Sequence, residues 1–275
     1  MQFIARTSLA ILFIALVTQS EAYTLRLTPG MGQIDLSGQI YDHRSFTVGI
    51  TDNGFQDAVW GQVRTIQLRR KTYEDKDVES GFGYVSYLPT TRWWVGGGTY
   101  TLNSDGVFVT VVPWVQASYA ATPAFWLQSA VFGGSRNENG FEGGLGQAEC
   151  NFLYFVQHNQ FKLGGFASAA KGQQPGGGGV AQYTLKTQWF DFTTMACIGD
   201  FSHWIERETL LKYETPIRTN AIGRGVATVY VTHQLFVEGA AEYNRCTSPF
   251  TQKLFRSKEV ESWFGSFGLG YRSGW

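Results

Sequence analysis

The chain has little cysteine, histidine, proline or charge. It contains 3 cysteines, 4 histidines and 7 prolines among 275 residues. Only 16% of its residues are charged, whereas soluble domains average about 25%. Acidic and basic residues balance at 22 each, so the composition predicts neither a nucleic-acid partner nor an acidic substrate.

The three cysteines are Cys150, Cys197 and Cys246. They form no CxxC pair and no Cys/His cluster with the spacing of a metal site, so no metal is expected. One disulfide with a leftover thiol, or three separate thiols packed as small hydrophobic groups, are both compatible with the sequence.

No apolar run of eighteen or more residues follows Ala22, which excludes a helical membrane protein. The apolar run near the start, Ser8–Val17, is too short to span a bilayer comfortably and follows the basic residue Arg6. Small residues, Ser20 and Ala22, occupy the positions that a signal peptidase requires. The sequence therefore predicts a cleaved signal peptide over residues 1–22 and one exported domain over residues 23–275.

Glycine and aromatic residues are abundant, and many segments alternate between apolar and polar residues. The stretch Gln33–Tyr41 predicts one strand, because Ile34, Leu36 and Ile40 would share a face opposite its polar residues. An apolar face towards lipid and a polar face towards water are typical of a membrane barrel. The same apolar residues could also face the core of a soluble β-sandwich.

The C-terminal stretch Trp263–Trp275 alternates in the same way. Its apolar face carries Phe267, Leu269, Tyr271 and Trp275. The stretch resembles the C-terminal signature of Gram-negative outer-membrane β-barrels, although Ser273 stands where an apolar residue is more usual. The resemblance implies that these four residues form an assembly signal read by the barrel-assembly machinery, that periplasmic chaperones assist biogenesis, and that the mature protein contacts outer-membrane lipid and lipopolysaccharide.

We therefore predict an all-β fold, a closed antiparallel transmembrane β-barrel in which the last strand pairs with a strand near the N-terminus. Turn residues recur about every twenty residues, which favours roughly twelve strands within a range of ten to fourteen, and bacterial single-chain barrels need an even number. Trp93, Trp94 and Tyr100 suit either a membrane interface or packing within the sheet.

Charged and amide side chains on the polar strand faces are candidates for lining the lumen. These candidates are Asp35, Gln39, Arg64, Lys186, Asp200, Glu238 and Arg272. They could line an open pore, or they could pair with one another inside a closed barrel, because barrels of about eight strands have no open channel.

Catalytic chemistry has weak support in the sequence. Ser202 and His203 lie close to Asp200 and Glu206, but neighbouring residues of a strand point to opposite faces. The glycine run 176–179 lacks the lysine and the helix of a phosphate-binding loop. No catalytic residue and no cofactor are predicted. The leading hypothesis is a small pore, passive transport barrel or structural barrel in the bacterial outer membrane. The alternatives are a barrel enzyme that hydrolyses lipid or peptide, and a secreted β-sandwich binding module.

Overall fold

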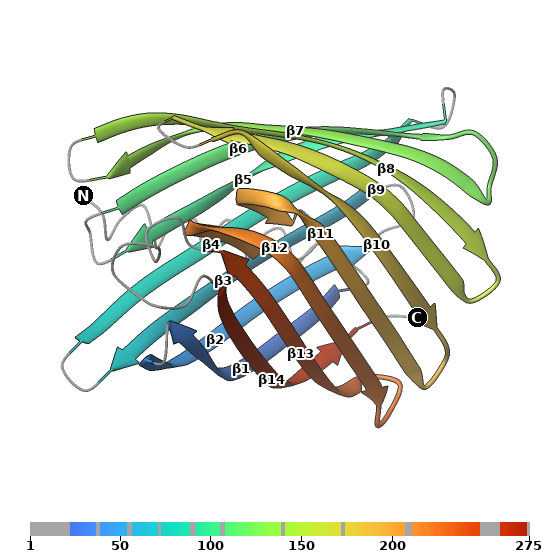
Figure 1. The fold of residues 1–275 in the computed structure, drawn as a ribbon. Helices are drawn as coiled ribbons and strands as arrows, with labels where there is room; N and C mark the ends of the chain where they lie inside the picture. The colour runs from blue at the N-terminus through green and yellow to red at the C-terminus, as the bar shows by residue number, and fades with distance from the viewer. Residues whose placement is uncertain are drawn as a thin grey trace, which may run out of the picture.

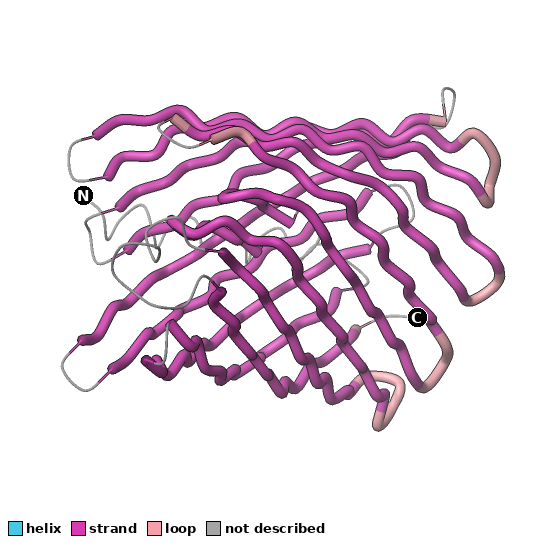
Figure 2. The backbone as a smooth tube through the Cα atoms, viewed as in Figure 1, coloured by secondary structure: helices cyan, strands magenta, loops and turns pink. Residues whose placement is uncertain are grey.

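The computed structural model describes residues 23–36, 39–53, 57–70, 73–88, 92–104, 108–138, 141–171, 174–206, 211–247 and 259–273. Figure 2 shows strands and short loops throughout these residues. They contain no helix that is long and apolar enough to cross a membrane. The strands are β1 (Tyr23–Leu36), β2 (Gln39–Asn53), β3 (Asp57–Arg70), β4 (Tyr73–Leu88), β5 (Trp93–Ser104), β6 (Phe108–Ala120), β7 (Phe125–Glu138), β8 (Phe141–Val156), β9 (Asn159–Ala170), β10 (Gly176–Lys186), β11 (Phe190–Glu206), β12 (Leu211–Tyr230), β13 (Leu235–Thr247) and β14 (Glu259–Arg272).

The strands form one closed barrel (Figure 1). Each strand pairs antiparallel with the next in sequence, and β14 pairs with β1 from Thr24 opposite Arg272 to Asp35 opposite Glu261. The predicted closed antiparallel barrel, with its last strand paired to a strand near the N-terminus, is confirmed. Closure leaves no free edge strand, so every strand has a partner for its backbone hydrogen bonds on both sides.

The prediction of about twelve strands is wrong, because the barrel has fourteen. The error begins at Gln33–Tyr41, which is not one strand: β1 ends at Leu36 and β2 begins at Gln39. Leu36 pairs with Gln39 and Asp35 pairs with Ile40 across this turn. The two faces predicted for a single strand therefore do not exist, and the side chains of residues 34–41 lie outside those that the structure describes.

The two ends of the barrel differ in what they carry. One end, the turn end, holds the start of β1, the end of β14 and the connections from β2 to β3, β4 to β5 and so on to β12 to β13. The opposite end, the loop end, holds the remaining connections, including residues 248–258 between β13 and β14. Thus Tyr23 at the start of β1 and Arg272 at the end of β14 both lie at the turn end.

Among the side chains that the structure describes, the outward face of the wall is largely apolar. Large exposed side chains such as Val115 (64% exposed), Leu163 (65%) and Leu269 (59%) alternate with buried neighbours. They occur on strands all around the wall and include Leu27, Met31, Val48, Val63, Val95, Val131, Phe152, Ile198, Val229, Trp263 and Phe267. Soluble monomers rarely expose continuous apolar areas above a few hundred Å², so this belt is typical of a surface that faces lipid.

Aromatic side chains gather on the outward face near the turn end. They are Trp93, Phe125, Tyr154, Phe161, Trp189 and Phe190. Such girdles occur where a barrel wall crosses the membrane interface. Of the three aromatic residues considered from sequence, Trp93 belongs to this girdle, Trp94 packs against Trp126 with ring centroids 6.1 Å apart, and Tyr100 is completely buried.

The cysteines carry no disulfide. Cys150 is exposed, while Cys197 and Cys246 are buried, and all three are free thiols. Of the two arrangements compatible with the sequence, the structure has three separate thiols. The Cys246 sulfur lies 3.6 Å from the hydroxyl of Thr219.

Adjacent residues of β14 should respond oppositely to a new charge. Phe267 faces outward and is 58% exposed, while Ser266 faces inward opposite the small residues Gly30 and Ala240. We expect Phe267→Arg to lower the free energy of unfolding by about 2–4 kcal/mol near the bilayer midplane. Ser266→Arg, the matched control, should cost far less. Urea unfolding in lipid vesicles measures both, and equal losses would contradict the assignment of the two faces.

Candidate functional site

The inward face of the wall carries a row of hydrogen-bonding side chains. Ser118 lies directly opposite Gln128, and Gln128 lies directly opposite Asn151, so the row crosses β6, β7 and β8. All three are buried. Within the described part of the chain, Ser118 Oγ and Asn151 Nδ2 have no hydrogen-bond partner. This row of neutral polar groups lies near the β6–β7 connection, because Ser118 is two residues before the end of β6 at Ala120.

Charged groups line the lumen at the turn end. The Arg26 guanidinium lies 3.5 Å from the Glu238 carboxylate, which also accepts a 3.2 Å hydrogen bond from the Thr228 hydroxyl. Arg26 and Glu238 come from β1 and β13, which flank β14 in the wall. This ion pair therefore spans a strand along the inside of the barrel.

A second set of contacts continues this lining. The Tyr230 hydroxyl donates a 2.7 Å hydrogen bond to Asp191, and the Arg272 guanidinium lies 4.4 Å from the centre of the Tyr230 ring. Lys186 is directly opposite Asp191 in the register of β10 and β11. The turn end of the lumen therefore combines cations and anions that are paired locally, which gives it no strong charge of one sign.

The end of β11 leaves the wall and enters the lumen. Trp204 and Ile205 are neighbours in sequence and point to opposite sides, yet they are only 2% and 0% exposed. Trp204 stacks on Phe166 of β9, with ring centroids 5.0 Å apart. Ile205 belongs instead to a buried cluster of side chains from β5 to β8, which includes Trp114 and Phe132. A strand that remained in the wall could not bury both neighbours, so residues 203–206, the inward segment, lie inside the barrel.

Gln147 confirms this position. Its side-chain amide donates a 2.9 Å hydrogen bond to the carbonyl of Ile205 and accepts a 2.8 Å hydrogen bond from the Ile205 amide nitrogen. Gln147 is on β8, which is separated from β11 by β9 and β10 in the sheet. A contact between these two strands must cross the lumen. The inward segment therefore obstructs the interior in the half nearer the loop end.

The register of the wall changes where the inward segment departs. Ile198 pairs with Ala221 and Phe201 with Thr219, but His203 pairs with Glu214, so β12 has additional residues at this point. The first residues of β12 follow β11, while Arg218 onwards pairs with β13. The hairpin between β11 and β12 thus has one part in the wall and one part inside.

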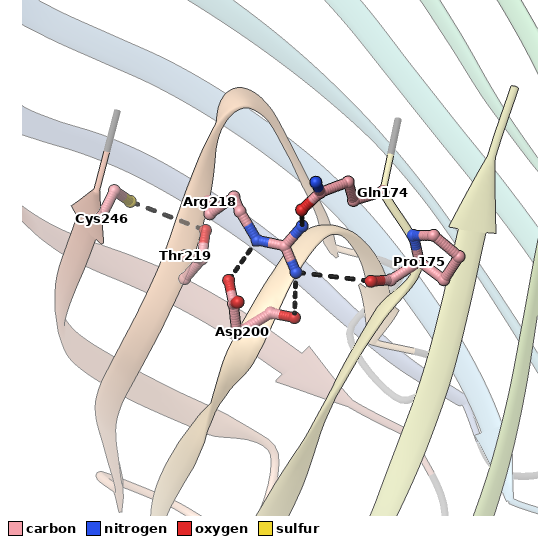
Figure 3. A network of polar contacts seen from close by, with 6 residues as sticks. All are labelled: Gln174, Pro175, Asp200, Arg218, Thr219 and Cys246. Atoms are coloured by element: carbon pink, nitrogen blue, oxygen red, sulfur yellow. Dashed lines mark hydrogen bonds and ion pairs between the residues drawn. The ribbon is translucent and has the colours of Figure 1, made fainter. Parts of the chain in front are cut away.

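Arg218 joins the strands around this departure point (Figure 3). Its guanidinium donates hydrogen bonds to the Asp200 carboxylate and, at 3.0 Å, to the Asp200 carbonyl. It also reaches the Gln174 side chain at 3.1 Å and the Pro175 carbonyl at 3.4 Å. Arg218 therefore connects β12 to the residues just before β10, next to the point where β11 bends away from the wall.

The predicted lumen-facing residues fall in different places. Glu238, Arg272 and Lys186 take part in the inward arrangement at the turn end. Arg64 lies opposite Thr47 and next to the exposed Val63.

Asp200 shares its strand face with the exposed Ile198 and not with the buried Cys197 and Phe201, so it lies on the outward side of β11. Its carboxylate binds Arg218. The side chains of Asp35 and Gln39 lie outside the described part, as do those of Ser202 and His203.

Sequence reasoning missed Gln147, Trp204, Ile205 and Arg218. The one local signal is the pair Trp204–Ile205, where two large apolar neighbours break the alternation expected of a strand that has lipid on one side only. The hydrogen-bond partner of Ile205 is Gln147, which is 58 residues away in sequence. No local pattern indicates that contact.

The wall and its two faces define a membrane-type β-barrel with an obstructed polar lumen. No protein-family model matches the chain, and no curated protein matches it significantly. Solved structures of similar fold include the CymD monoaromatic hydrocarbon channel, with 7% identity, a TM-score of 0.56 and coverage of 93% of this chain and 89% of that chain. The Pseudomonas putida toluene transporter TodX has 6% identity, a TM-score of 0.54 and coverage of 92% and 89%.

A third similar structure is described as a bacterial polysaccharide outer membrane secretin, with 7% identity, a TM-score of 0.53 and coverage of 92% of this chain and 99% of that chain. At these identities the likeness shows a shared fold only. The fold is that of outer-membrane β-barrels.

Packing inside the lumen should contribute more to stability than packing on the lipid face. Phe166 is 7% exposed and contacts both Phe201 and Trp204, whereas Phe152 is 48% exposed on the outward face of β8. We expect Phe166→Ala to lower the free energy of unfolding by about 3–5 kcal/mol and Phe152→Ala to lower it clearly less. Urea titration of both variants in the same detergent tests this. A smaller loss for Phe166→Ala would show that the inward segment does not pack there.

Proposed function

We propose that the protein is an outer-membrane barrel that lets small solutes pass passively through its lumen. One observation carries this proposal: among the described side chains the outward face is largely apolar, while the inward face carries hydrogen-bonding and charged groups. Polar lumens are typical of barrels that hold water and conduct solutes.

The lining favours a neutral solute with apolar surface. Buried aromatic rings, including Trp114, Phe132 and Phe166, share the inward face of the wall with the neutral polar row of Ser118, Gln128 and Asn151. The charges at the turn end are paired with one another, so neither cations nor anions gain a strong field. The similar folds of a monoaromatic hydrocarbon channel and a toluene transporter are consistent with small aromatic solutes.

The proposal includes an orientation in the membrane. In outer-membrane barrels the longest connections face outward, and the longest connection here, residues 248–258, is at the loop end. The turn end would then be periplasmic, and residues 248–258 would lie at the cell surface near lipopolysaccharide. This orientation requires export through the signal peptide predicted over residues 1–22, which leaves residues 23–275 as the barrel domain.

Planar-bilayer recording on refolded protein tests the proposed function. We expect small, brief conductance steps for the native chain, because the inward segment obstructs the lumen. Replacing residues 202–217 with a four-residue turn that has Asn-Gly at its centre should remove the obstruction. The conductance steps should then become larger and sustained. A control that shortens residues 248–258 by a similar replacement keeps the inward segment and should conduct like the native chain. No conductance from any of these folded barrels would contradict a transport role.

We also propose that the barrel-assembly machinery reads the C-terminal strand. Support comes from the outward apolar face of β14, which carries Phe267 and Leu269. Tyr271 pairs with Leu25 of β1, and Trp275 lies outside the described residues.

Deleting Trp275 should reduce the level of the protein in outer membranes while leaving refolding yield in detergent nearly unchanged. One residue at a strand end adds few backbone hydrogen bonds, whereas a recognition signal would lose its anchor. Immunoblots of membrane fractions, compared with refolding yields, measure the two effects. Normal membrane levels of the truncated chain would show that Trp275 is not part of an assembly signal.

A further inference from the structure

We propose that the turn end of the lumen holds a binding site for a neutral six-membered ring compound that carries hydroxyl groups. The site joins a platform of three inward-facing aromatic rings, Trp94, Trp126 and Phe155, to hydrogen-bonding side chains beside it. This inference deepens the proposed function and rests on it for the entry of solutes into the lumen. It adds where such a solute binds and which chemical groups the site selects.

Three strands carry two aromatic residues in a row at the turn end of the barrel. These pairs are Trp93–Trp94 on β5, Phe125–Trp126 on β7 and Tyr154–Phe155 on β8. The first member of each pair is exposed and belongs to the outward girdle. Successive residues of a strand point to opposite faces, so the second member of each pair faces the lumen. The membrane interface therefore accounts for only one ring of each pair.

The three inward rings form one continuous platform. The ring of Trp126 lies between the other two, with its centroid 6.1 Å from that of Trp94 and 5.6 Å from that of Phe155. The Trp126 indole nitrogen donates a 3.3 Å hydrogen bond to the Pro123 carbonyl in the turn between β6 and β7, which holds this ring at the turn end. All three rings are half-buried, so part of each is accessible. A ring compound can therefore pack against this platform through its apolar face.

Hydrogen-bonding side chains continue the platform around the inward face of the wall. Gln160 of β9 lies directly opposite Phe155, and Thr184 of β10 lies directly opposite Gln160. The hydroxyls of Thr184 and Thr193 are 3.2 Å apart, and the Gln182 side chain donates a 3.4 Å hydrogen bond to Thr184. Amide and hydroxyl groups together offer donors and acceptors. A hydroxyl group on a ligand needs both, because it donates one hydrogen bond and accepts others.

Two polar atoms without partners adjoin the platform on its other side. Trp94 lies directly opposite Ser118, the first residue of the neutral polar row. Within the described part of the chain, Ser118 Oγ and Asn151 Nδ2 lack a hydrogen-bond partner, although each side chain is only 2% exposed. Such atoms are costly to leave unsatisfied. Their strands are two apart, roughly 10 Å across the sheet, so a ring with more than one hydroxyl is better suited to supply partners than a ring with one.

The charges near the site favour a neutral compound. Lys162 lies two residues along β9 from Gln160, but it is buried and has a partner of its own. Elsewhere at the turn end, Arg26 is paired with Glu238. A charged group on the ligand would gain little from charges that are already paired, and it would lose its hydration.

Binding to the refolded barrel in detergent tests the site without any need for conductance. The probes are resorcinol, an aromatic ring with two hydroxyls, and methyl β-D-glucopyranoside, a saturated ring with hydroxyls. Saturation-transfer NMR on each probe measures its Kd. Trp126→Ala removes the middle of the platform and should raise the Kd about tenfold. Phe125→Ala, the matched control, removes the neighbouring outward ring and should change the Kd by less than about twofold.

Gln160→Leu provides a second variant, which keeps the platform and the size of the side chain. It should raise the Kd about fivefold, because it removes an amide that can hydrogen-bond the ligand. Gln62 offers the control, since it faces inward on β3, away from the platform. Gln62→Leu should leave the Kd within about twofold of the native value. Gel mobility with and without boiling verifies that each variant is folded, and the Gln160 pair decides the question if Trp126→Ala does not fold.

The outcomes separate this site from the proposed function. A Kd for resorcinol that depends on Trp126 and Gln160 supports the site with an aromatic ligand, and the same result for the glucoside supports it with a saturated ring. Binding of neither probe to the native barrel, or equal losses in each variant and its control, would overturn the site. A native chain that conducts but binds neither probe leaves passive transport intact. A chain that binds a probe in the expected way but does not conduct removes the transport role alone.

Discussion

The structure depends on one constraint, which is that every backbone amide and carbonyl in contact with lipid needs a hydrogen-bond partner within the protein. A closed sheet meets this constraint for all strands, and here β14 closes on β1 along ten register pairs. Closure also fixes which side chains meet lipid and which meet the lumen, because successive residues of a strand alternate between the two. The apolar belt with Leu163 and Phe267 and the inward pair Arg26–Glu238 are two results of the same closure.

The inward segment is a local exception that still obeys this constraint. Where β11 leaves the wall, the strands beside it lose a regular partner, and the side chain of Arg218 donates to the carbonyls of Asp200 and Pro175 at that place. Inside the lumen, Gln147 supplies both a donor and an acceptor to the backbone of Ile205. The side chains of Arg218 and Gln147 therefore replace backbone hydrogen bonds between strands, Arg218 in the wall and Gln147 inside the lumen. The aromatic contacts of Trp204 and the burial of Ile205 then stabilise the segment in the lumen.

Local alternation in the sequence is sufficient to predict the fold class but not all of its details. In β14 it assigns Trp263, Phe267 and Leu269 to the outward face, where the structure has them. It fails at Gln33–Tyr41, because only two residues separate the paired strands β1 and β2 and hardly interrupt the alternation, so the predicted strand count is too low. The inward segment could not be predicted, since it is fixed by contacts between residues far apart in sequence, such as Ile205 and Gln147. Asp200 looked like a lumen charge because its neighbours gave no sign that Arg218 would bind it on the outer side.

Spin labels placed singly at positions 204 and 205 test the central claim, that residues 203–206 lie inside the barrel, most directly. Collision of the nitroxide with oxygen, which concentrates in lipid, reports whether a position faces the bilayer. A segment inside the lumen gives low oxygen accessibility at both neighbouring positions, while a label at the outward position 267 gives high accessibility as a reference. High oxygen accessibility at either position 204 or position 205 would place the end of β11 in the wall and contradict the account.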